Sequence, residues 1–232
     1  MHVVVCVKQI PDPAIPGELD PSTHALKREG KLILDESDSY GVEMALQLAD
    51  AAGGGEVTLV SMAPNNEVSG LRTALAMGAA KAILVSDEAL VGSDSLSTAK
   101  VLAKAIERVG GIDLVLTATE STDGYSGTIP GQVAELLGWP SLTFAKHVEI
   151  ADGKAKIQRQ TEAGYDVVEA SLPAVVSASA PWSASSEMST APAAPIASAV
   201  RRPETSLFGA IETKVTSPPP ALSTSWSAIS TP

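Results

Sequence analysis

The segment Ala118–Ile129 has the composition best suited to binding an anion. It holds two glycines and five Ser or Thr residues, and it leads into a predicted helix at Gln132–Leu137. A polar loop at a helix N-terminus offers backbone N–H groups and the positive end of the helix dipole to a phosphate. An ordinary loop with a helix cap remains the alternative, because the sequence contains neither GxGxxG nor GxxxxGK[ST].

A second polar group is the acidic segment Asp35–Asp38, which reads DESD at the start of another predicted helix. Carboxylates at this position cap the helix and compensate its dipole. They could also contact the ribose or the adenine edge of a nucleotide. The two roles are compatible, and the sequence leaves both open.

The other reactive side chains show no catalytic arrangement. Cys6 is the single cysteine; it ends an apolar run and is interpreted as a packed thiol facing a pocket. Lys8 could meet a phosphate or a carboxylate. The histidines, at positions 2, 24 and 147, are widely spaced and share no metal-ligand pattern. We therefore expect no catalytic residue and no metal site.

Composition narrows the class of protein. The 232 residues suit one domain, or one domain with an appendage, and the core must be aliphatic because only 3% of residues are aromatic. A net charge of -11 argues against binding to nucleic acid, which needs basic contacts to phosphate. A lone cysteine favours the cytoplasm over a secreted disulfide framework. The apolar run that begins at His2 leaves no room for a signal peptide and is too short to span a bilayer.

These candidate residues need a scaffold, and the hydrophobic pattern predicts one. Short β-branched runs alternate with amphipathic helical segments, which is typical of βαβ units. We therefore expect an α/β, Rossmann-like nucleotide-binding fold: a mostly parallel sheet with helices on both faces. The predicted strands are His2–Val7, Val57–Met62, Ala82–Ser86, Leu114–Thr117 and Ala174–Ser177, and the predicted helices are Ser37–Ala51, Asn66–Met77, Asp94–Val109 and Gln132–Leu137.

Such a sheet would bring three loops together. Ligands bind outside the carboxyl ends of parallel strands. The loops Lys8–Asp12, Met62–Asn66 and Ala118–Ile129 each follow a predicted strand, so we expect them to meet at one edge of the sheet.

The last third of the chain departs from this pattern. The turn signal Ala151-Asp152-Gly153 predicts an antiparallel hairpin excursion near residues 144–170. From Ser177 onward, 38 of 56 residues are Ser, Thr, Ala or Pro, a composition that buries little surface against its ordering entropy. We expect a nucleotide-binding domain at residues 1–177 and an irregular C-terminal tail, or a diverged partner arm, at 178–232.

Five segments in order resemble the β subunit of electron-transfer flavoproteins. They are VVVCVKQIPDP at the start, LRTALAMGAAKAILV at 71–85, STDG within the 118–129 loop, GQVAELLGWPSLTF at 131–144 and LPAVVS at 172–177. Together they cover residues 1 to about 177. The word RTALAMGA followed by an apolar strand is fairly specific to this family, and the ordered set is more so.

The resemblance implies an electron carrier rather than an enzyme. Such β subunits bury a structural AMP and form a heterodimer with a larger α subunit, which holds most of the FAD. The pair accepts electrons from dehydrogenases, often acyl-CoA dehydrogenases of fatty acid oxidation. It passes them to a membrane quinone oxidoreductase or another acceptor.

The resemblance also implies which positions bind the AMP. They fall on the first strand, the start of the first long helix, the end of the second strand and the third loop. In this sequence these are Cys6; Asp35, Glu36, Ser37 and Asp38; Met62; and Ala118, Thr119, Glu120, Ser121, Thr122, Asp123, Gly124, Tyr125, Ser126, Gly127, Thr128 and Ile129.

Two departures qualify this site. Relatives often read Asn-Gln-Thr where this chain has Gly127-Thr128-Ile129, so side-chain amide contacts are lost while backbone amides can still hold a phosphate. Relatives with a second FAD usually continue Asp-Gly with Asp-Thr. Here Asp123-Gly124 precedes Tyr125-Ser126, which favours AMP over a second flavin.

Beyond Ser177 the family's Asn-Glu-Pro-Arg-Tyr segment, Lys-rich run and wrapping arm are not visible. A diverged arm or a frame-shifted C-terminus would explain this. Reading the coding DNA in its alternate frames tests the second idea, and absence of those words there would reject it. The alternative functions are a stand-alone ATP-binding protein, although the 118–129 loop is poor in glycine and lysine, and a small hydrolase, for which no nucleophile is present.

Overall fold

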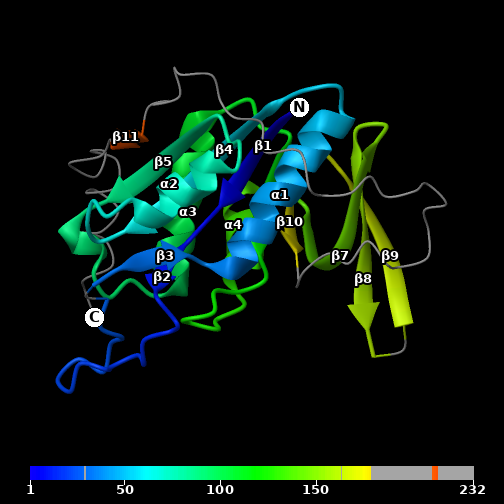
Figure 1. Cartoon of the computed structure of the whole chain (residues 1–232). Coiled ribbons are helices and arrows are strands. Elements are labelled where there is room, and N and C mark those ends of the chain that lie inside the picture. The colour runs from blue at the N-terminus through cyan, green and yellow to red at the C-terminus, as the bar shows by residue number, and fades with distance from the viewer. Residues whose placement is uncertain (29, 163, 179–210, 214–232) are drawn as a thin grey trace, which may run out of the picture.

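The computed structural model describes residues 1–28, 30–162, 164–178 and 211–213 (Figure 1). Most of the predicted tail, residues 179–210 and 214–232, therefore lies outside the described part of the chain. Of the tail, only Ala178 and residues 211–213 are described. The division into domains at residue 177 stays a prediction.

The described chain is built on one large sheet with strand order β11-β5-β4-β1-β6-β10-β7-β8-β9 (Figure 1). All pairs from β11 to β7 are parallel, and β7-β8-β9 are antiparallel. The predicted mostly parallel α/β fold is confirmed. The strands of this sheet are β1 His2–Cys6, β4 Glu56–Ala63, β5 Lys81–Ser86, β6 Leu114–Ala118, β7 Ser141–Ala151, β8 Lys154–Thr161, β9 Gly164–Ser171, β10 Ala174–Ala178 and β11 Ile211–Thr213.

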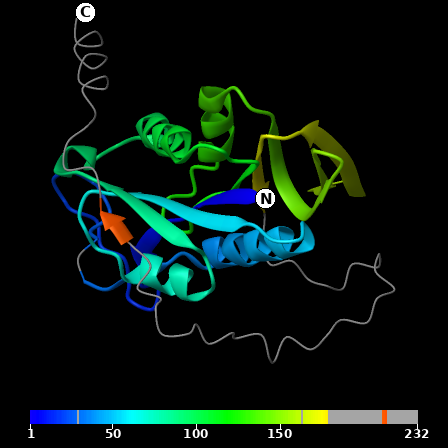
Figure 2. The same ribbon diagram turned by 90° about the horizontal axis from the view of Figure 1, so that it is seen from above.

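Helices cover both faces of the parallel part, as Figure 2 shows from above. They are α1 Glu36–Ala51, α2 Ser69–Ala76, α3 Ser95–Val109 and α4 Ile129–Leu137, with a short 3-10 turn η1 Glu88–Leu90. Val3 and Val5 of β1 belong to the buried cluster under α1 and α2. Val4 belongs to the cluster under α3 and α4. Alternate residues of one apolar strand thus enter two separate cores, which is why the strand shows no polar alternation.

The connections change face beside β1. From β1 the chain reaches β4 and then β5 through α1 and α2 on one face, and it returns to β6 through α3 on the other. The strand order therefore reverses between β1 and β6. In an open parallel sheet this topological switch point leaves a crevice outside the carboxyl ends of the two strands, where ligands bind.

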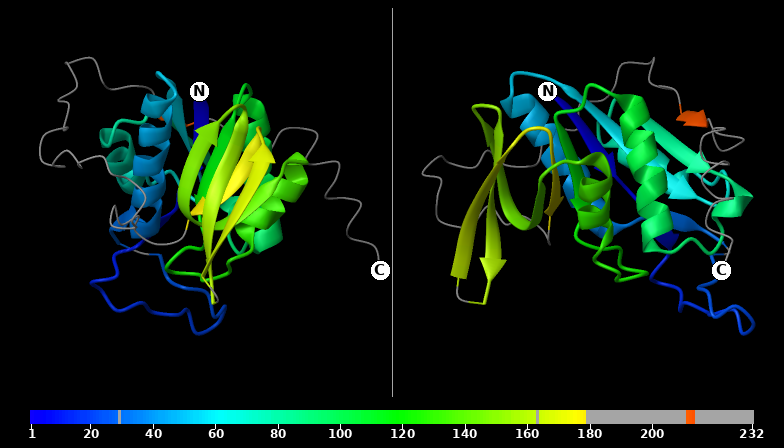
Figure 3. Two further views of the ribbon diagram at one scale, coloured as in Figure 1. Left: turned by 90° about the vertical axis from the view of Figure 1, so that its right-hand side faces the viewer. Right: turned by 180° about the vertical axis from the view of Figure 1, so that it is seen from behind.

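The antiparallel excursion is also confirmed (Figure 3, left). Strands β7 and β8 are joined by Asp152 and Gly153, whose φ angles are 51° and 71°. Positive φ at both central residues is the type I′ geometry that suits a two-residue hairpin. Val148 and Ile157 are buried on the inner face of these antiparallel strands.

Two helices begin three residues away from the predicted start. Helix α2 begins at Ser69 rather than Asn66, because the side chains of Asn65 and Glu67 accept bonds from the backbone N–H groups of Glu67 and Ser69 and hold a turn there. Helix α4 begins at Ile129 rather than Gln132, with Pro130 in its first turn, a position that proline favours.

A second, two-stranded sheet was not predicted. It pairs β2 Gln9–Pro11 with β3 Leu32–Leu34 in antiparallel register. Each strand has three residues, too few to show a period. The pair places Lys8 beside Asp35, whose N–H donates to the Lys8 carbonyl at 3.0 Å.

Candidate functional site

An ion-pair cluster occupies the switch point between β1 and β6. Lys8 follows β1, and its Nζ donates to Asp123 Oδ1 at 2.6 Å and to Ser121 Oγ at 3.1 Å. Arg28, from the long loop before β3, pairs with the other Asp123 oxygen. The loops after β1 and β6, predicted to meet, are therefore in contact. Arg28 was missed because no sequence pattern connects it with this edge.

Asp123 is the centre of this cluster. Its side chain is only 6% exposed, whereas Lys8 and Arg28 are 38% and 32% exposed. Burial works to raise the pKa of the Asp123 carboxyl, but the hydrogen bond and charge of Lys8, with the charge of Arg28, outweigh it and lower the pKa. The carboxylate thus stays ionised and fixes two cations at the rim of the crevice.

The acidic segment joins the same site through Asp35. Asp35 is fully buried at the N-cap of α1, where Oδ1 accepts the N–H of Ser37 at 3.0 Å. Its Oδ2 accepts both the N–H and the hydroxyl of Thr122, at 2.8 and 2.9 Å. The capping role is confirmed, and the same carboxylate shapes the 118–129 loop. Contact with a nucleotide stays a prediction.

Asp38 is a second buried carboxyl group. Its Oδ2 accepts the N–H of Lys8 at 2.6 Å, and the side chain lies in the first turn of α1. Burial raises its pKa well above the ordinary value, the charge of Asp35 adds to this, and the hydrogen bond from Lys8 offsets only part of it. Asp38 therefore holds a proton at a pH where exposed carboxyl groups have lost theirs.

This raised pKa predicts a pH-dependent difference between the wild type and Asp38→Asn. Above pH 3.8 the unfolded state releases the Asp38 proton, whereas the folded state keeps it. The contribution of Asp38 to the free energy of unfolding therefore decreases as the pH rises from 3.8 towards the folded pKa. The Asn amide can accept the same Lys8 N–H without titrating. We expect the free energy of unfolding of the variant, relative to wild type, to rise with pH; urea unfolding at pH 5 and pH 8 measures it. A constant difference would contradict the assignment.

Cys6 and Met62 lie on the α3/α4 side of the sheet. Cys6, 8% exposed, ends β1, and Met62 is half-buried beside the same core cluster. Burial, with a smaller contribution from Asp38, raises the pKa of the Cys6 thiol to about 12. The predicted packed position of Cys6 is confirmed, and the group is a thiol at neutral pH.

Cys6 provides a direct chemical probe, because it is the single cysteine of the chain. A buried thiol with a pKa of about 12 is almost free of the reactive thiolate at pH 8. We expect a disulfide reagent such as Ellman's to react slowly with the folded protein and to release one equivalent in denaturant. Rapid reaction of the native chain would show that this end of β1 is open.

The N-terminus of α4 is ready to bind an anion. Its N-cap residue Thr128 makes no side-chain capping bond, so the N–H groups of Ile129 and Gly131 lack the usual oxygen partner, while Pro130 between them has no N–H. Two polar atoms on the α3/α4 side of the sheet, Thr117 Oγ1 and Gln132 Oε1, are buried and have no hydrogen-bond partner among the described residues. Uncapped amides and unpaired buried polar atoms fit a phosphate-bearing ligand with further hydrogen-bonding groups.

The tip of the 118–129 segment is a tight turn. The carbonyl of Ser121 accepts the N–H groups of Gly124 and Tyr125 at 3.3 and 2.9 Å. Tyr125 has a φ of 47° and is 68% exposed, and Gly127 has a φ of 63°. Gly127 suits this left-handed conformation, whereas Tyr125 adopts it at a steric cost.

Not every predicted residue joins the cluster. Glu36 is exposed, and its carboxylate accepts from the Tyr40 hydroxyl at 3.4 Å. Asn66, at the end of the loop after β4, accepts from Ser86 Oγ at 2.5 Å and so bonds towards β5, away from β6. This bond joins the Met62–Asn66 loop to the end of β5, and its meeting with the other two loops stays a prediction.

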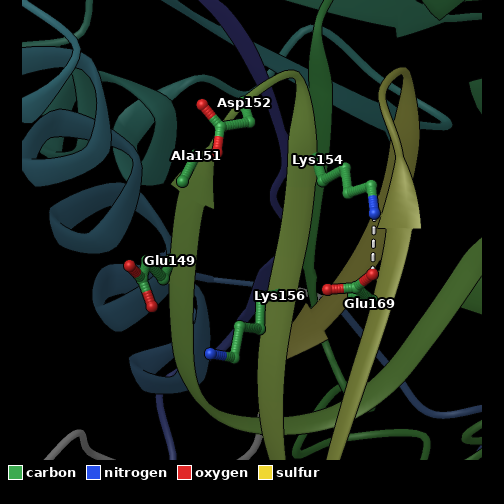
Figure 4. A pocket seen from close by; sticks show the side chains of 6 residues that line it. All are labelled: Glu149, Ala151, Asp152, Lys154, Lys156 and Glu169. Atoms are coloured by element: carbon green, nitrogen blue, oxygen red, sulfur yellow. Dashed lines mark hydrogen bonds and ion pairs between the residues drawn. The ribbon is translucent and has the colours of Figure 1, made fainter.

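A separate surface pocket lies on the outer face of the antiparallel sheet (Figure 4). Charged side chains of β7, β8 and β9 line it, and Glu149, Lys156 and Glu169 are paired across the strands. Lys154 Nζ donates to Glu169 at 2.7 Å. Ligand sites are mostly apolar with a few polar groups. We interpret this pocket as a solvated ladder of charges rather than a cofactor site.

The described part of the chain holds no group of three or more His, Cys, Asp or Glu side chains placed to bind a metal. Within the same residues, no helix combines the length and apolar character that crossing a membrane requires.

Comparison with known proteins places the chain in a family. The family model described as "Electron transfer flavoprotein domain" matches residues 23–200. Electron transfer flavoprotein subunit beta of Mycobacterium tuberculosis is 40% identical over 181 residues, which span 76% of this chain and 68% of that protein. The Caffeyl-CoA reductase-Etf complex subunit CarD of Acetobacterium woodii is 38% identical over 177 residues, 76% of this chain and 67% of that protein. The chain therefore belongs to the electron transfer flavoprotein family, as a beta subunit that serves electron transfer.

Proposed function

We propose that this chain binds a structural AMP at the switch point between β1 and β6, and that it pairs with an FAD-bearing alpha subunit. The heterodimer would carry electrons from dehydrogenases, such as acyl-CoA dehydrogenases, to a quinone oxidoreductase or another acceptor. Membership in the beta-subunit family supports the partner and the role. A cytoplasmic location and the identity of donor and acceptor stay predictions.

The observation that carries the nucleotide proposal is the uncapped N-terminus of α4 at the end of the loop that holds the Lys8–Asp123–Arg28 cluster. Thr128 leaves the first amides of α4 without a side-chain cap. Lys8 and Arg28 bring two positive charges to the loop that leads into this helix, and Asp123 neutralises one of them. Backbone amides and the N–H donors of Lys8 and Arg28 suit a phosphate.

The charge balance favours a monophosphate over a triphosphate. Asp123 already engages both cations, and the buried Asp35 adds a negative group bonded to Thr122. Little positive charge remains to compensate the three or four charges of ATP. The stand-alone ATP-binding alternative is less well supported for this reason.

The chain's own residues would act by position. When bound, FAD supplies the redox chemistry. Asp35 and Asp123 hold the loops after β1 and β6 in one arrangement. A nucleotide bound between these loops would stabilise the same arrangement, and with it the surface that this subunit offers to its partner. Nothing in this role requires a catalytic side chain.

Co-expression with an alpha subunit from a related electron transfer flavoprotein tests the proposal. We expect a yellow heterodimer with flavin absorption. Heat denaturation of this complex should release FAD and AMP in comparable amounts, which chromatography measures. ATP turnover by this chain alone, or a complex with flavin but no AMP, would contradict it. The identity of the released nucleotide also shows whether this site binds AMP or a second FAD.

A further inference from the structure

We propose that Thr117 and Gln132 form a nucleoside subsite on the α3/α4 side of the sheet, taking a hydrogen-bond donor of the ligand: a base amino group or a ribose hydroxyl. The inference rests on the proposed nucleotide site and adds two contact residues to it. Neither lies in the 118–129 segment from which phosphate binding was predicted.

Thr117 is placed by β6. It pairs in register with Cys6 of β1 and Ser177 of β10, at the carboxyl end of the parallel strands. Its side chain is on the same side of β6 as Val115, which packs in the α3/α4 core. The residue is only 4% exposed, yet Oγ1 has no hydrogen-bond partner among the described residues.

Gln132 approaches the same edge from α4. It is the fourth residue of that helix, and its Nε2 donates to Oγ of Ser95, the first residue of α3, at 3.4 Å. That bond is long, and the amide oxygen is buried with no partner in the described chain. Gln132 therefore lies where the two helices begin, and both begin at the carboxyl edge of the sheet (Figure 3, right).

The position of these two atoms points to a ligand. Buried polar groups in native proteins are nearly always paired, so two unpaired atoms on one side of one edge call for a partner. A phosphate on the uncapped amides of α4 would bring the rest of the nucleotide to this side of the sheet. The amide oxygen accepts only, and the Thr117 hydroxyl can accept or donate, so amino or hydroxyl groups of the ligand satisfy them.

Ser61 offers a matched control. Its Oγ is also buried and unpaired among the described residues, but Ser61 alternates with Val60 and shares the side of β4 that holds Leu59, in the α1/α2 core. Ser61 therefore has the same kind of unpaired hydroxyl as Thr117, but on the face of the sheet opposite to the proposed subsite.

The test compares Thr117→Val, Gln132→Met and Ser61→Ala in the full chain. Removing an unpaired buried polar atom leaves the nucleotide-free protein as stable as before or more so, while removing a ligand contact weakens binding. Without nucleotide, we expect unchanged or higher melting temperatures for Thr117→Val and Ser61→Ala, and at most a small decrease for Gln132→Met, which also loses the long bond from Nε2 to Ser95. We expect AMP to bind about tenfold more weakly to the first two variants by calorimetric titration, and normally to Ser61→Ala. Thr117→Ser, which keeps the hydroxyl, should retain affinity.

Two further ligands show whether the base or the ribose donates the hydrogen bond to Gln132. If Gln132 contacts the base amino group, wild type should discriminate against inosine monophosphate and Gln132→Met should not. If it contacts the ribose, the same loss should appear with deoxyadenosine monophosphates. Equal AMP affinity of wild type, Thr117→Val and Gln132→Met would overturn the subsite. A weaker affinity found only in variants whose melting temperature has also fallen would overturn it as well. A wild-type chain that binds no AMP would instead overturn the proposed function.

Discussion

Replacement of Asp123 by Asn is expected to lower the melting temperature by about 6–12 °C, and to lower the AMP content because the ion pairs no longer hold Lys8 and Arg28 against the 118–129 loop. The buried carboxylate accepts bonds from Lys8 and Arg28, and the neutral amide leaves two neighbouring cations without their counter-charge. Breaking a buried charge pair costs about 3 kcal/mol, and for a chain of this length each kcal/mol shifts the melting temperature by roughly 2–4 °C. Thermal unfolding and the AMP content of the purified protein measure the two effects.

Lys154→Gln is the matched control. The Lys154–Glu169 pair has a contact of 2.7 Å, against 2.6 Å for Lys8–Asp123, but both of its side chains are at least half exposed. Exposed pairs of this kind contribute less than about 1 kcal/mol. Equal melting temperatures for the two variants would show that burial of Asp123 adds nothing.

The effect of Asp123→Asn should also depend on pH. The folded pKa of Asp123 is lowered, so its stabilisation is present above the unfolded value of 3.8 and is lost as pH falls through the folded pKa. The melting temperatures of wild type and variant should therefore converge in acid.

The parts of the fold that the sequence predicted are those set by local hydrophobic pattern. The run at His2–Val7 and the period of Ser37–Ala51 gave β1 and α1 nearly to the residue. Because parallel strands end at one edge, the meeting of Lys8 with the 118–129 loop followed from the same pattern. The contacts of Lys8 with Ser121 and Asp123 bear this out.

The parts that it did not predict depend on contacts between distant residues. Arg28 lies 95 positions from Asp123 in a loop without a period, so only the folded chain shows the pair. The absence of a partner for Thr117 Oγ1 and for Gln132 Oε1 within the described chain is a property of packing, and no residue type encodes it. Strands β2 and β3 were missed because three residues cannot display alternation.

The β2–β3 pair nevertheless supports the site, because it joins Lys8 to Asp35. Gln9 of β2 is 6% exposed and clamps α2: its Oε1 accepts the Gly70 N–H at 2.8 Å, and its Nε2 donates to the Glu67 carbonyl at 2.6 Å. The position of Lys8 at the crevice thus depends on how closely α2 packs on this small sheet.

Gly70→Ala should disrupt that packing. A Cβ at Gly70 would lie 2.8 Å from Gln9 Cγ and from the backbone N of Leu34, and 3.0 Å from the carbonyl carbon of Ile33. Backbone atoms of β3 cannot retreat without breaking their pairing with β2, so we expect a loss of about 3 kcal/mol in the free energy of unfolding. We also expect a lower AMP content, because Lys8 and Asp35 move with the two strands.

Gly41→Ala distinguishes this clash from a general intolerance of alanine in buried helices. Gly41 is also buried, in α1, but its Cβ would meet only Val5 Cγ1, at an ordinary 3.5 Å. Alanine has the higher helix propensity, by about 1 kcal/mol, so this variant should be as stable as wild type or more so. Urea unfolding of both variants measures the difference. If the two variants had equal free energies of unfolding, strands β2 and β3 would be free to shift. Their pairing could then not be what positions Lys8 at the crevice.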